Sequence, residues 1–231
     1  MSDAFGEYRP AAPLRPVLRT RASAFSYECR ACGRCCREKL IPVNPYEVAR
    51  LAAHLGIGTT EFIARYTEGG TSLAVREDVT CIFLDQGGCA VHADRPLACR
   101  LYPLGLVTTP EGEAVVELEP QAGSEGVRGE AGTVAQFLEA QGVAPYLDAS
   151  HRYHTALDHL VAALSAACGA DDAAQTLQDA PGAPAPEILD LDAALAALDR
   201  PVPDTIEERV AMHLAHLDDL AATLERSATA R

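Results

Sequence analysis

Two groups of cysteines are the residues of this chain best suited to chemistry. Seven thiols belong to them: Cys29, Cys32, Cys35, Cys36, Cys81, Cys89 and Cys99. A Cys-x-x-Cys step lets two sulfurs point at one ion through a tight turn, and Gly33 in the first group leaves the backbone free to bend around that ion. The spacing therefore predicts a metal site, occupied by zinc or by iron as an iron–sulfur centre.

The number of donors leaves the metal open. Seven thiols and His92 would serve two tetrahedral zinc ions, whereas one [4Fe-4S] cluster needs four thiolates. His92 is then either a ligand, a hydrogen-bond donor to a thiolate, or a surface residue of a hairpin. The adjacent Cys35 and Cys36 point differently, and the second group is one thiol short of a closed four-cysteine site. We therefore expect the two groups to converge on one site.

The thiols have two interpretations other than metal binding, as buried apolar residues and as a redox pair. Cysteine is often a buried small apolar residue, and a redox Cys-x-x-Cys needs a strand–helix context that the segment before Cys29 does not offer. Cys168, alone on the apolar face of a predicted helix, is expected to be structural. Arginines near the thiols either offset thiolate charge or belong to a solvated basic arm, and Arg100, directly after Cys99, is the best placed to offset charge. The other candidates are Arg30, Arg34, Arg37 and Arg95.

Charge and hydropathy limit the classes of partner that the chain is expected to bind. The net charge of −14 disfavours nucleic acid, although residues 1–40 hold eight of the 19 basic and only four of the 33 acidic residues. No secretory signal and no apolar run long enough to span a membrane is visible. We expect a cytoplasmic protein with reduced thiols, no membrane and no nucleic acid partner, and an unknown protein partner remains open.

The elements that must position the thiols follow from local signals. Asn44 with Pro45 and Glu47 marks a helix start, and Gly56 its end; a second helix is expected from Thr59 or Thr60 to residues 69–70. Strands are expected at 80–84 and 89–92, joined by the turn 85–88, and a further hairpin at 104–108 and 114–118. Helices are expected at 133–141, 144–168, 187–199 and 204–226, with a proline-containing linker at 169–186.

These elements predict an α+β fold: a small cysteine-rich metal-binding domain with a helical hairpin and short β-hairpins, then a mainly helical C-terminal region. The expected division is an irregular, proline-containing arm at 1–24, the cysteine domain at 25–128 and the helical region at 129–231. Five histidines on the last long helices suggest a second metal site, but the Glu-x-x-His steps of di-iron bundles are absent. They are His151, His154, His159, His213 and His216.

Over residues 26–108 the chain resembles the YkgJ-type cysteine-cluster proteins, which carry a CxxCxxCC zinc- or iron-chelating domain. The likeness rests on Cys29-Arg30-Ala31-Cys32-Gly33-Arg34-Cys35-Cys36 and on Arg95-Pro96-Leu97-Ala98-Cys99-Arg100-Leu101-Tyr102-Pro103. It implies that the seven cysteines bind the metal. A relative, the flagellin lysine N-methylase, links such a domain to an iron–sulfur cluster.

Two functions stay open at this point. One is a metal-binding protein with a structural, metal-handling or partner-docking role. The other is an iron–sulfur-dependent enzyme related to the flagellin lysine N-methylase, although no nucleotide loop, serine nucleophile or S-adenosylmethionine motif is visible. An enzyme should have a cleft beside the metal with a base or substrate-binding group, whereas a structural site should be closed by four protein ligands.

Overall fold

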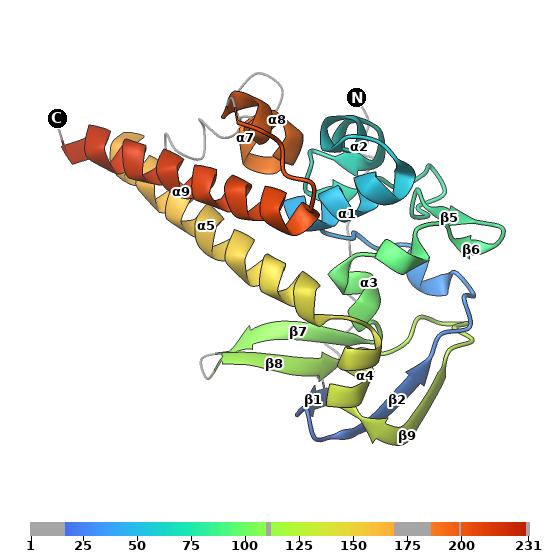
Figure 1. Cartoon of the computed structure of the whole chain (residues 1–231). Coiled ribbons are helices and arrows are strands. Elements are labelled where there is room, and N and C mark those ends of the chain that lie inside the picture. The colour runs from blue at the N-terminus through green and yellow to red at the C-terminus, as the bar shows by residue number, and fades with distance from the viewer. Residues whose placement is uncertain (1–16, 110–111, 169–185, 199, 230–231) are drawn as a thin grey trace, which may run out of the picture.

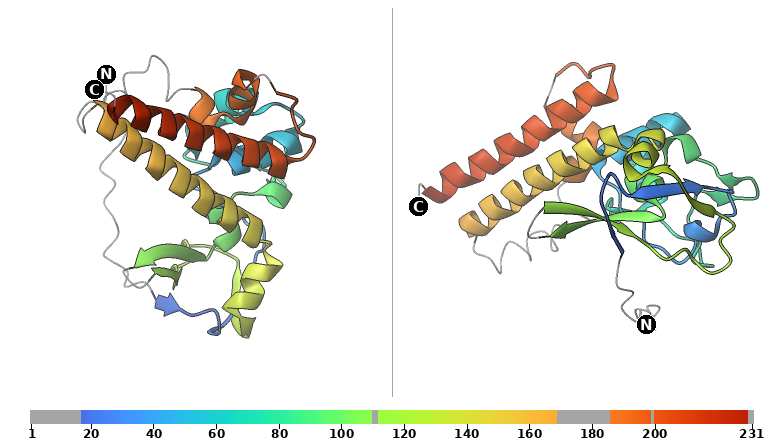
Figure 2. Two further views of the ribbon diagram at one scale, coloured as in Figure 1. Left: turned by 60° about the vertical axis from the view of Figure 1, so that its left-hand side comes forward. Right: turned by 90° about the horizontal axis from the view of Figure 1, so that it is seen from below.

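The protein combines helices with small antiparallel strand pairs, which confirms the predicted α+β class with a helical C-terminal region. A computed structural model describes residues 17–109, 112–168, 186–198 and 200–229. Figure 1 shows the two longest helices, α5 (Ala144–Cys168) and α9 (Ile206–Thr229), running side by side, with short strands below them and at the right of the view. Both views of Figure 2 show these helices extending beyond the rest of the described chain.

Helix α1 (Pro45–Leu55) has the ends that its sequence predicts. The Asn44 side chain accepts a hydrogen bond from the Glu47 backbone N–H, and the Glu47 carboxylate accepts one from the Asn44 N–H. Gly56 ends the helix with a φ of 69°, a left-handed conformation that glycine adopts without strain. The predicted helix is therefore confirmed at both ends.

Helix α2 (Thr59–Tyr66) starts where predicted but ends earlier than residues 69–70. The chain instead forms a hairpin of two two-residue strands, β3 (Thr67–Glu68) and β4 (Ser72–Leu73), whose turn contains Gly69 and Gly70. The short strands expected at 80–84 and 89–92 are also wrong in extent. Only β5 (Leu84–Asp85) and β6 (Gly88–Cys89) pair, because residues 80 and 81 bond to the first cysteine loop, and residues 92–94 form the 3-10 turn η2 (His92–Asp94).

The strands at the N-terminal end pair with strands about 100 residues further along. β1 (Val17–Arg19) lies against β8 (Gly112–Glu117), which also pairs with β7 (Leu104–Thr109) as the sequence predicts. β2 (Ala24–Glu28) lies against β9 (Val127–Thr133). Residues 17–19 and 24 are therefore strand, where an irregular arm was expected, because distant partners supply their hydrogen bonds; residues 1–16 lie outside the described chain. Strand β9 crosses residue 128, and the division into domains stays a prediction.

The C-terminal region contains α4 (Val134–Ala140), α5, α7 (Pro186–Leu189), α8 (Leu191–Ala197) and α9, with residues 169–185 of the expected linker outside the described residues. The helix expected at 187–199 is two helices, because Asp190 caps α8. Buried Asp190 accepts hydrogen bonds from the hydroxyls of Thr59 and Thr60, and the Asp192 carboxylate accepts one from the Thr59 N–H. These bonds fasten the C-terminal helices to α2.

Three apolar clusters fill the described chain. The α5–α9 pair packs around Tyr153 and Leu217 with α8, a second cluster around Phe62 and Phe83 lies between α1, α2 and the cysteine segments, and a third around Leu104 joins the strands to α4. Cys81, Cys89 and Cys99 lie against the second cluster. In the part of the chain that the structure describes, no helix is long and apolar enough to cross a membrane.

Candidate metal centre

The first cysteine group lies on a tight loop that follows strand β2. After Glu28 the backbone turns twice through left-handed conformations, at Ala31 (φ 52°) and Gly33 (φ 69°), and then forms the 3-10 turn η1 (Arg34–Cys36). An added Cβ at Gly33 would lie 2.9 Å from a methyl group of Leu84. Glycine is therefore favoured there by its φ, and a Cβ would in addition require the Leu84 side chain to move.

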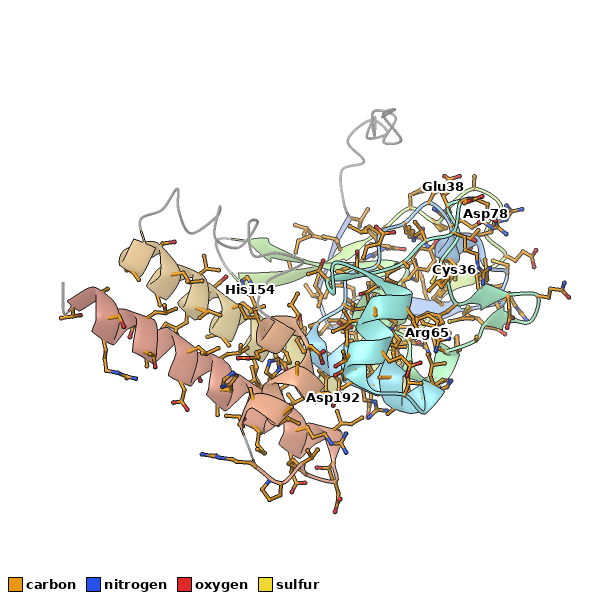
Figure 3. All side chains as sticks on the ribbon, turned by 90° about the horizontal axis from the view of Figure 1, so that it is seen from above. Cys36, Glu38, Arg65, Asp78, His154 and Asp192 are labelled. Atoms are coloured by element: carbon orange, nitrogen blue, oxygen red, sulfur yellow. The ribbon has the colours of Figure 1, made fainter. Side chains whose placement is uncertain are left out.

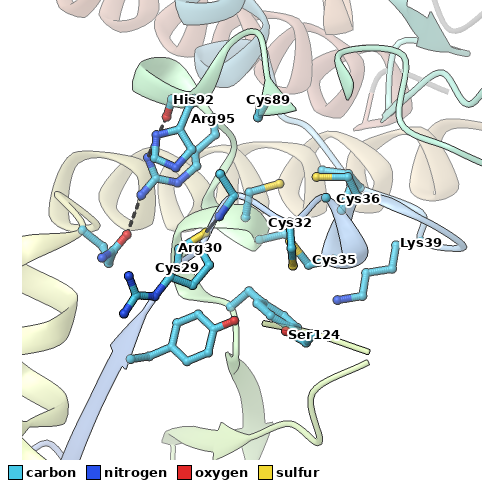
Figure 4. A pocket seen from close by; sticks show the side chains of 18 of the residues that line it. Cys29, Arg30, Cys32, Cys35, Cys36, Lys39, Cys89, His92, Arg95 and Ser124 are labelled. Carbon is cyan, nitrogen blue, oxygen red and sulfur yellow. Dashed lines mark hydrogen bonds between the residues drawn. The ribbon is translucent and has the colours of Figure 1, made fainter. Parts of the chain in front are cut away.

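The second group folds back onto this loop. The Cys81 backbone N–H donates to the Cys36 carbonyl over 2.8 Å, and Arg37 pairs with Thr80 in an antiparallel bridge. One cavity of about 250 Å³ is lined by cysteines of both groups (Figure 4). Its cysteines are Cys29, Cys32, Cys35, Cys36, Cys89 and Cys99. The predicted convergence of the two groups is confirmed for these six thiols, whereas Cys81 does not line the cavity and lies against the second apolar cluster.

Backbone N–H groups point at three of the sulfurs. The Ala31 N–H donates to Cys29 Sγ over 3.4 Å. Burial raises the pKa of Cys81 and Cys89, and hydrogen bonds from the backbone of Phe83 and Val91 counteract it. In each case the donor lies two residues after the cysteine. Such donors stabilise a thiolate and orient it, which is what a bound metal requires of the groups around its ligands.

The other thiols interact with one another. Cys36 donates a hydrogen bond to Cys35, which lowers the pKa of Cys35 to about 6 and raises that of Cys36. Burial raises the pKa of Cys99, and the nearby Cys81, Cys89 and Cys35 raise it further. Thiols of both groups therefore lie close enough to repel one another when they are ionised. A cation among them would remove that repulsion.

Helix α3 (Leu97–Leu101) presents Cys99, and a buried carboxylate holds its first turn. Glu47, 3% exposed, accepts the Leu97 N–H over 2.7 Å in addition to the Asn44 N–H. Burial raises the pKa of Glu47, and these two bonds counteract the shift. The residue that caps α1 therefore also fixes α3, and with it the position of Cys99.

The thiols are gathered but not yet arranged around one point. Among the residues that the structure describes, no three His, Cys, Asp or Glu side chains already have the geometry to hold a metal ion. Binding would therefore require the side chains to turn, while the N–H donors and the shared cavity fit thiolate ligands for zinc or iron.

The cations at this cavity are partly different from those expected. Arg30 lines it but pairs with exposed Glu28, and Arg95 donates to the carbonyl of His92 and to the side chain of Gln141. Lys39, which the sequence did not single out, lines the cavity and lies over the Tyr102 ring, 3.9 Å from its centre. His92 also lines the cavity, and its pKa is lowered by burial and by Arg95.

Arg100 does not face the thiols, so its expected role in offsetting their charge is wrong. Its guanidinium is buried, donates to the carbonyls of Ala93, Arg95 and Gln141 and to the Tyr146 hydroxyl, and stacks on the Tyr146 ring at 4.0 Å. Arg100 therefore links α3 to α5 through these bonds. Arg37 pairs instead with Asp78 at 3.9 Å.

We predict that Arg100→Met destabilises the fold by about 3 kcal/mol or more, because buried carbonyls would lose their donor. The free energy of unfolding from urea titration measures this loss. Arg65→Met is the matched control, since exposed Arg65 contacts exposed Glu61 and the ring of Tyr66, both on its own helix, and should change stability little. Equal losses in the two variants would contradict the assigned role of Arg100.

The histidines of the C-terminal helices do not assemble a second metal site among the described residues. His213 is fully buried between the Tyr153 hydroxyl and the Glu187 carbonyl, at 3.0 and 2.8 Å. His159 pairs with Glu225, and His154, exposed on α5, lies far from Cys36 in Figure 3. The backbone of Cys168 ends α5, and its side chain lies outside the described residues.

The fold and the cavity together define a cysteine-rich domain of the kind that binds metal through thiolates. Residues 28–120 match the CxxCxxCC family, described as a putative zinc- or iron-chelating domain, which is the family that the sequence was predicted to resemble. No significant match was found among curated proteins or among solved structures. The matched stretch begins at the end of β2 and contains all seven cysteines.

Proposed function

We propose that the chain binds zinc or an iron–sulfur centre in the cavity where its two cysteine groups meet, with the ligands drawn from the seven cysteines. The observation that carries this proposal is the convergence of six of these thiols on one cavity, although residues 29–36 and 89–99 lie apart in sequence. The N–H donors directed at Cys29, Cys81 and Cys89 support it.

The cavity also bears on the role of the metal. Cys29 is exposed, and the space beside the thiols is open to small molecules. The exposure of Cys29 at this cavity is compatible with metal handling or chemistry at the metal as well as with a structural role. Docking of a protein partner and a cytoplasmic location, where thiols stay reduced, are consistent with this proposal.

The second candidate is an iron–sulfur-dependent enzyme related to the flagellin lysine N-methylase. It is favoured by one observation: the cavity beside the thiols contains groups that could bind a substrate or move a proton, namely Lys39, His92 and Tyr27. The described residues of the C-terminal region supply none of the groups that line this cavity beyond Phe137 and Gln141. Any substrate would therefore be bound mainly by the cysteine domain.

Anaerobic purification followed by metal analysis and a visible absorption spectrum tests the first proposal and separates the metals. A brown protein with acid-labile sulfide identifies an iron–sulfur cluster, and a colourless protein with stoichiometric zinc identifies zinc. Reconstitution of the metal-free protein with each metal is the second arm. Protein that binds neither metal in either arm would overturn the proposal.

A further inference from the structure

Lys39 stands apart from every other cation in this chain. It is the only lysine among 19 basic residues, the other 18 being arginines, and it lies in the cysteine cavity. Figure 4 shows its side chain entering the cavity beside Cys35 and Cys36, across from His92 and Arg95. The chain thus places its one compact, flexible ammonium group at the candidate metal centre.

The ammonium group has no acceptor of its own. Across the residues that the structure describes, Lys39 makes no hydrogen bond or ion pair, and its defined contact is the Tyr102 ring. Arg30 and Arg95, by contrast, are already bonded to protein oxygens. A half-buried ammonium with three unused donors is costly unless something accepts from it.

The neighbouring thiolates are not a sufficient acceptor for the Lys39 ammonium group. Burial lowers the pKa of Lys39, and the thiols of Cys35, Cys99 and Cys36 counteract this shift. Once thiolates bind a metal, much of their charge is neutralised by it, so the proposed function leaves Lys39 facing a weaker acceptor. No Asp or Glu is found among the described residues that line the cavity, even though the chain has 33 acidic residues.

The walls around Lys39 are aromatic and aliphatic. Tyr27 and Tyr102 meet edge to face with their ring centres 6.0 Å apart. Leu40, 70% exposed, and Leu118, 40% exposed, stand at the cavity and leave apolar surface in water. Exposed apolar side chains at the edge of a cavity are typical of a ligand site.

We propose that the part of the cavity next to Lys39 binds a small organic monocarboxylate with a flat apolar body. The carboxylate accepts from the Lys39 ammonium, and the body lies against Tyr27, Tyr102 and the two leucines. One uncommitted cation suits a single negative charge, whereas phosphate sites use several donors. The volume of about 250 Å³, part of which the metal centre occupies, restricts the ligand to a small molecule.

Benzoate is the probe and benzamide, of the same shape but uncharged, is its control. Calorimetric titration of metal-loaded protein should show benzoate binding in the millimolar range or tighter, and Lys39→Met should weaken it by roughly tenfold to a hundredfold. Lys39→Arg, which keeps the charge, should weaken it less. Equal affinities for benzoate and benzamide, equal affinities of wild type and Lys39→Met, or no benzoate binding at about 10 mM would overturn the proposal.

A second measurement needs no variant. Because Lys39 is the only lysine, its modification by an amine-reactive reagent can be followed by peptide mass, separately from the N-terminal amine. Benzoate should slow this modification and benzamide should not. Metal content is determined on the same samples: retained metal without protection by benzoate overturns the carboxylate site alone, whereas protein that never binds metal overturns the proposed function. If Lys39→Met loses its metal, its benzoate affinity cannot be compared with that of the wild type. The protection of Lys39 by benzoate in the wild-type protein is then the test of the carboxylate site.

Discussion

Removal of the metal is expected to loosen the cysteine domain and to leave the α5–α9 pair folded. The loop at 29–36 contains no buried residue in its 3-10 turn, and Cys81, Cys89 and Cys99 form part of the border of the second apolar cluster. A structural metal contributes about 10–16 kcal/mol of binding free energy, which becomes folding free energy when the unfolded chain has no site. The cluster around Tyr153 and Leu217 includes no cysteine among its described members.

Hydrogen exchange of the metal-free protein resolves this prediction by segment. Amides of residues 29–41 and 80–102 should lose protection, those of α5 and α9 should keep it, and the first thermal midpoint should fall by about 10 °C or more. Return of the metal should restore both. A sample verified to be metal-free that keeps its midpoint and its exchange pattern would show that the metal does not support the fold.

Cys99→Ser is expected to abolish most metal binding. Cys99 projects from α3 among thiols of both groups, and a serine hydroxyl does not replace a thiolate ligand for zinc or for an iron–sulfur cluster. Metal per chain should fall to roughly a tenth or less, and Cys32→Ser should have the same effect. Metal analysis after anaerobic purification measures the loss.

Cys168→Ser is the matched control, because the backbone of Cys168 ends α5, outside the segment that the family match covers. It should retain the full metal content. The far-ultraviolet circular dichroism of the three variants should remain helical, since α5 and α9 do not depend on the thiols. Equal metal loss in all three variants would overturn the assignment of the ligands.

Local signals in the sequence were sufficient to predict helix α1 and the convergence of the two cysteine groups on one site. The cap at Asn44 and Glu47 and the end at Gly56 depend on residues within one helix, so they can be read without the rest of the fold. The convergence was predicted because neither group could close a site alone. Both inferences depend on chemistry that a few neighbouring residues already determine.

Strands β1, β2 and β9 could not be predicted in the same way. β1 and β2 have three and five residues, and their partners lie about 100 residues away, so nothing local distinguishes them from irregular chain. The segment at 80–83 misled for a related reason: its backbone bonds go to the first cysteine loop rather than into a regular hairpin. Long-range partners decided each of these cases.

The positions of Arg100 and Lys39 relative to the thiols could not be predicted from the sequence, for geometric reasons. Arg100 follows Cys99 in sequence, but successive residues of a helix point about 100° apart, so Arg100 faces Tyr146 while Cys99 faces the thiols. Lys39 was overlooked because its position over Tyr102 depends on a residue far along the chain. Its being the only lysine was the available signal in the sequence.

The pairing of β2 with β9 has a consequence for the protein as it is made. Strand β2 leads directly into Cys29, yet its partner strand ends at Thr133, about 100 residues later. At roughly 5–20 residues per second, the first four thiols leave the ribosome about 5–20 s before the strand that anchors their loop. During that interval the paired strand does not yet hold their loop, so metal ions and oxidants can reach these thiols before the fold is complete.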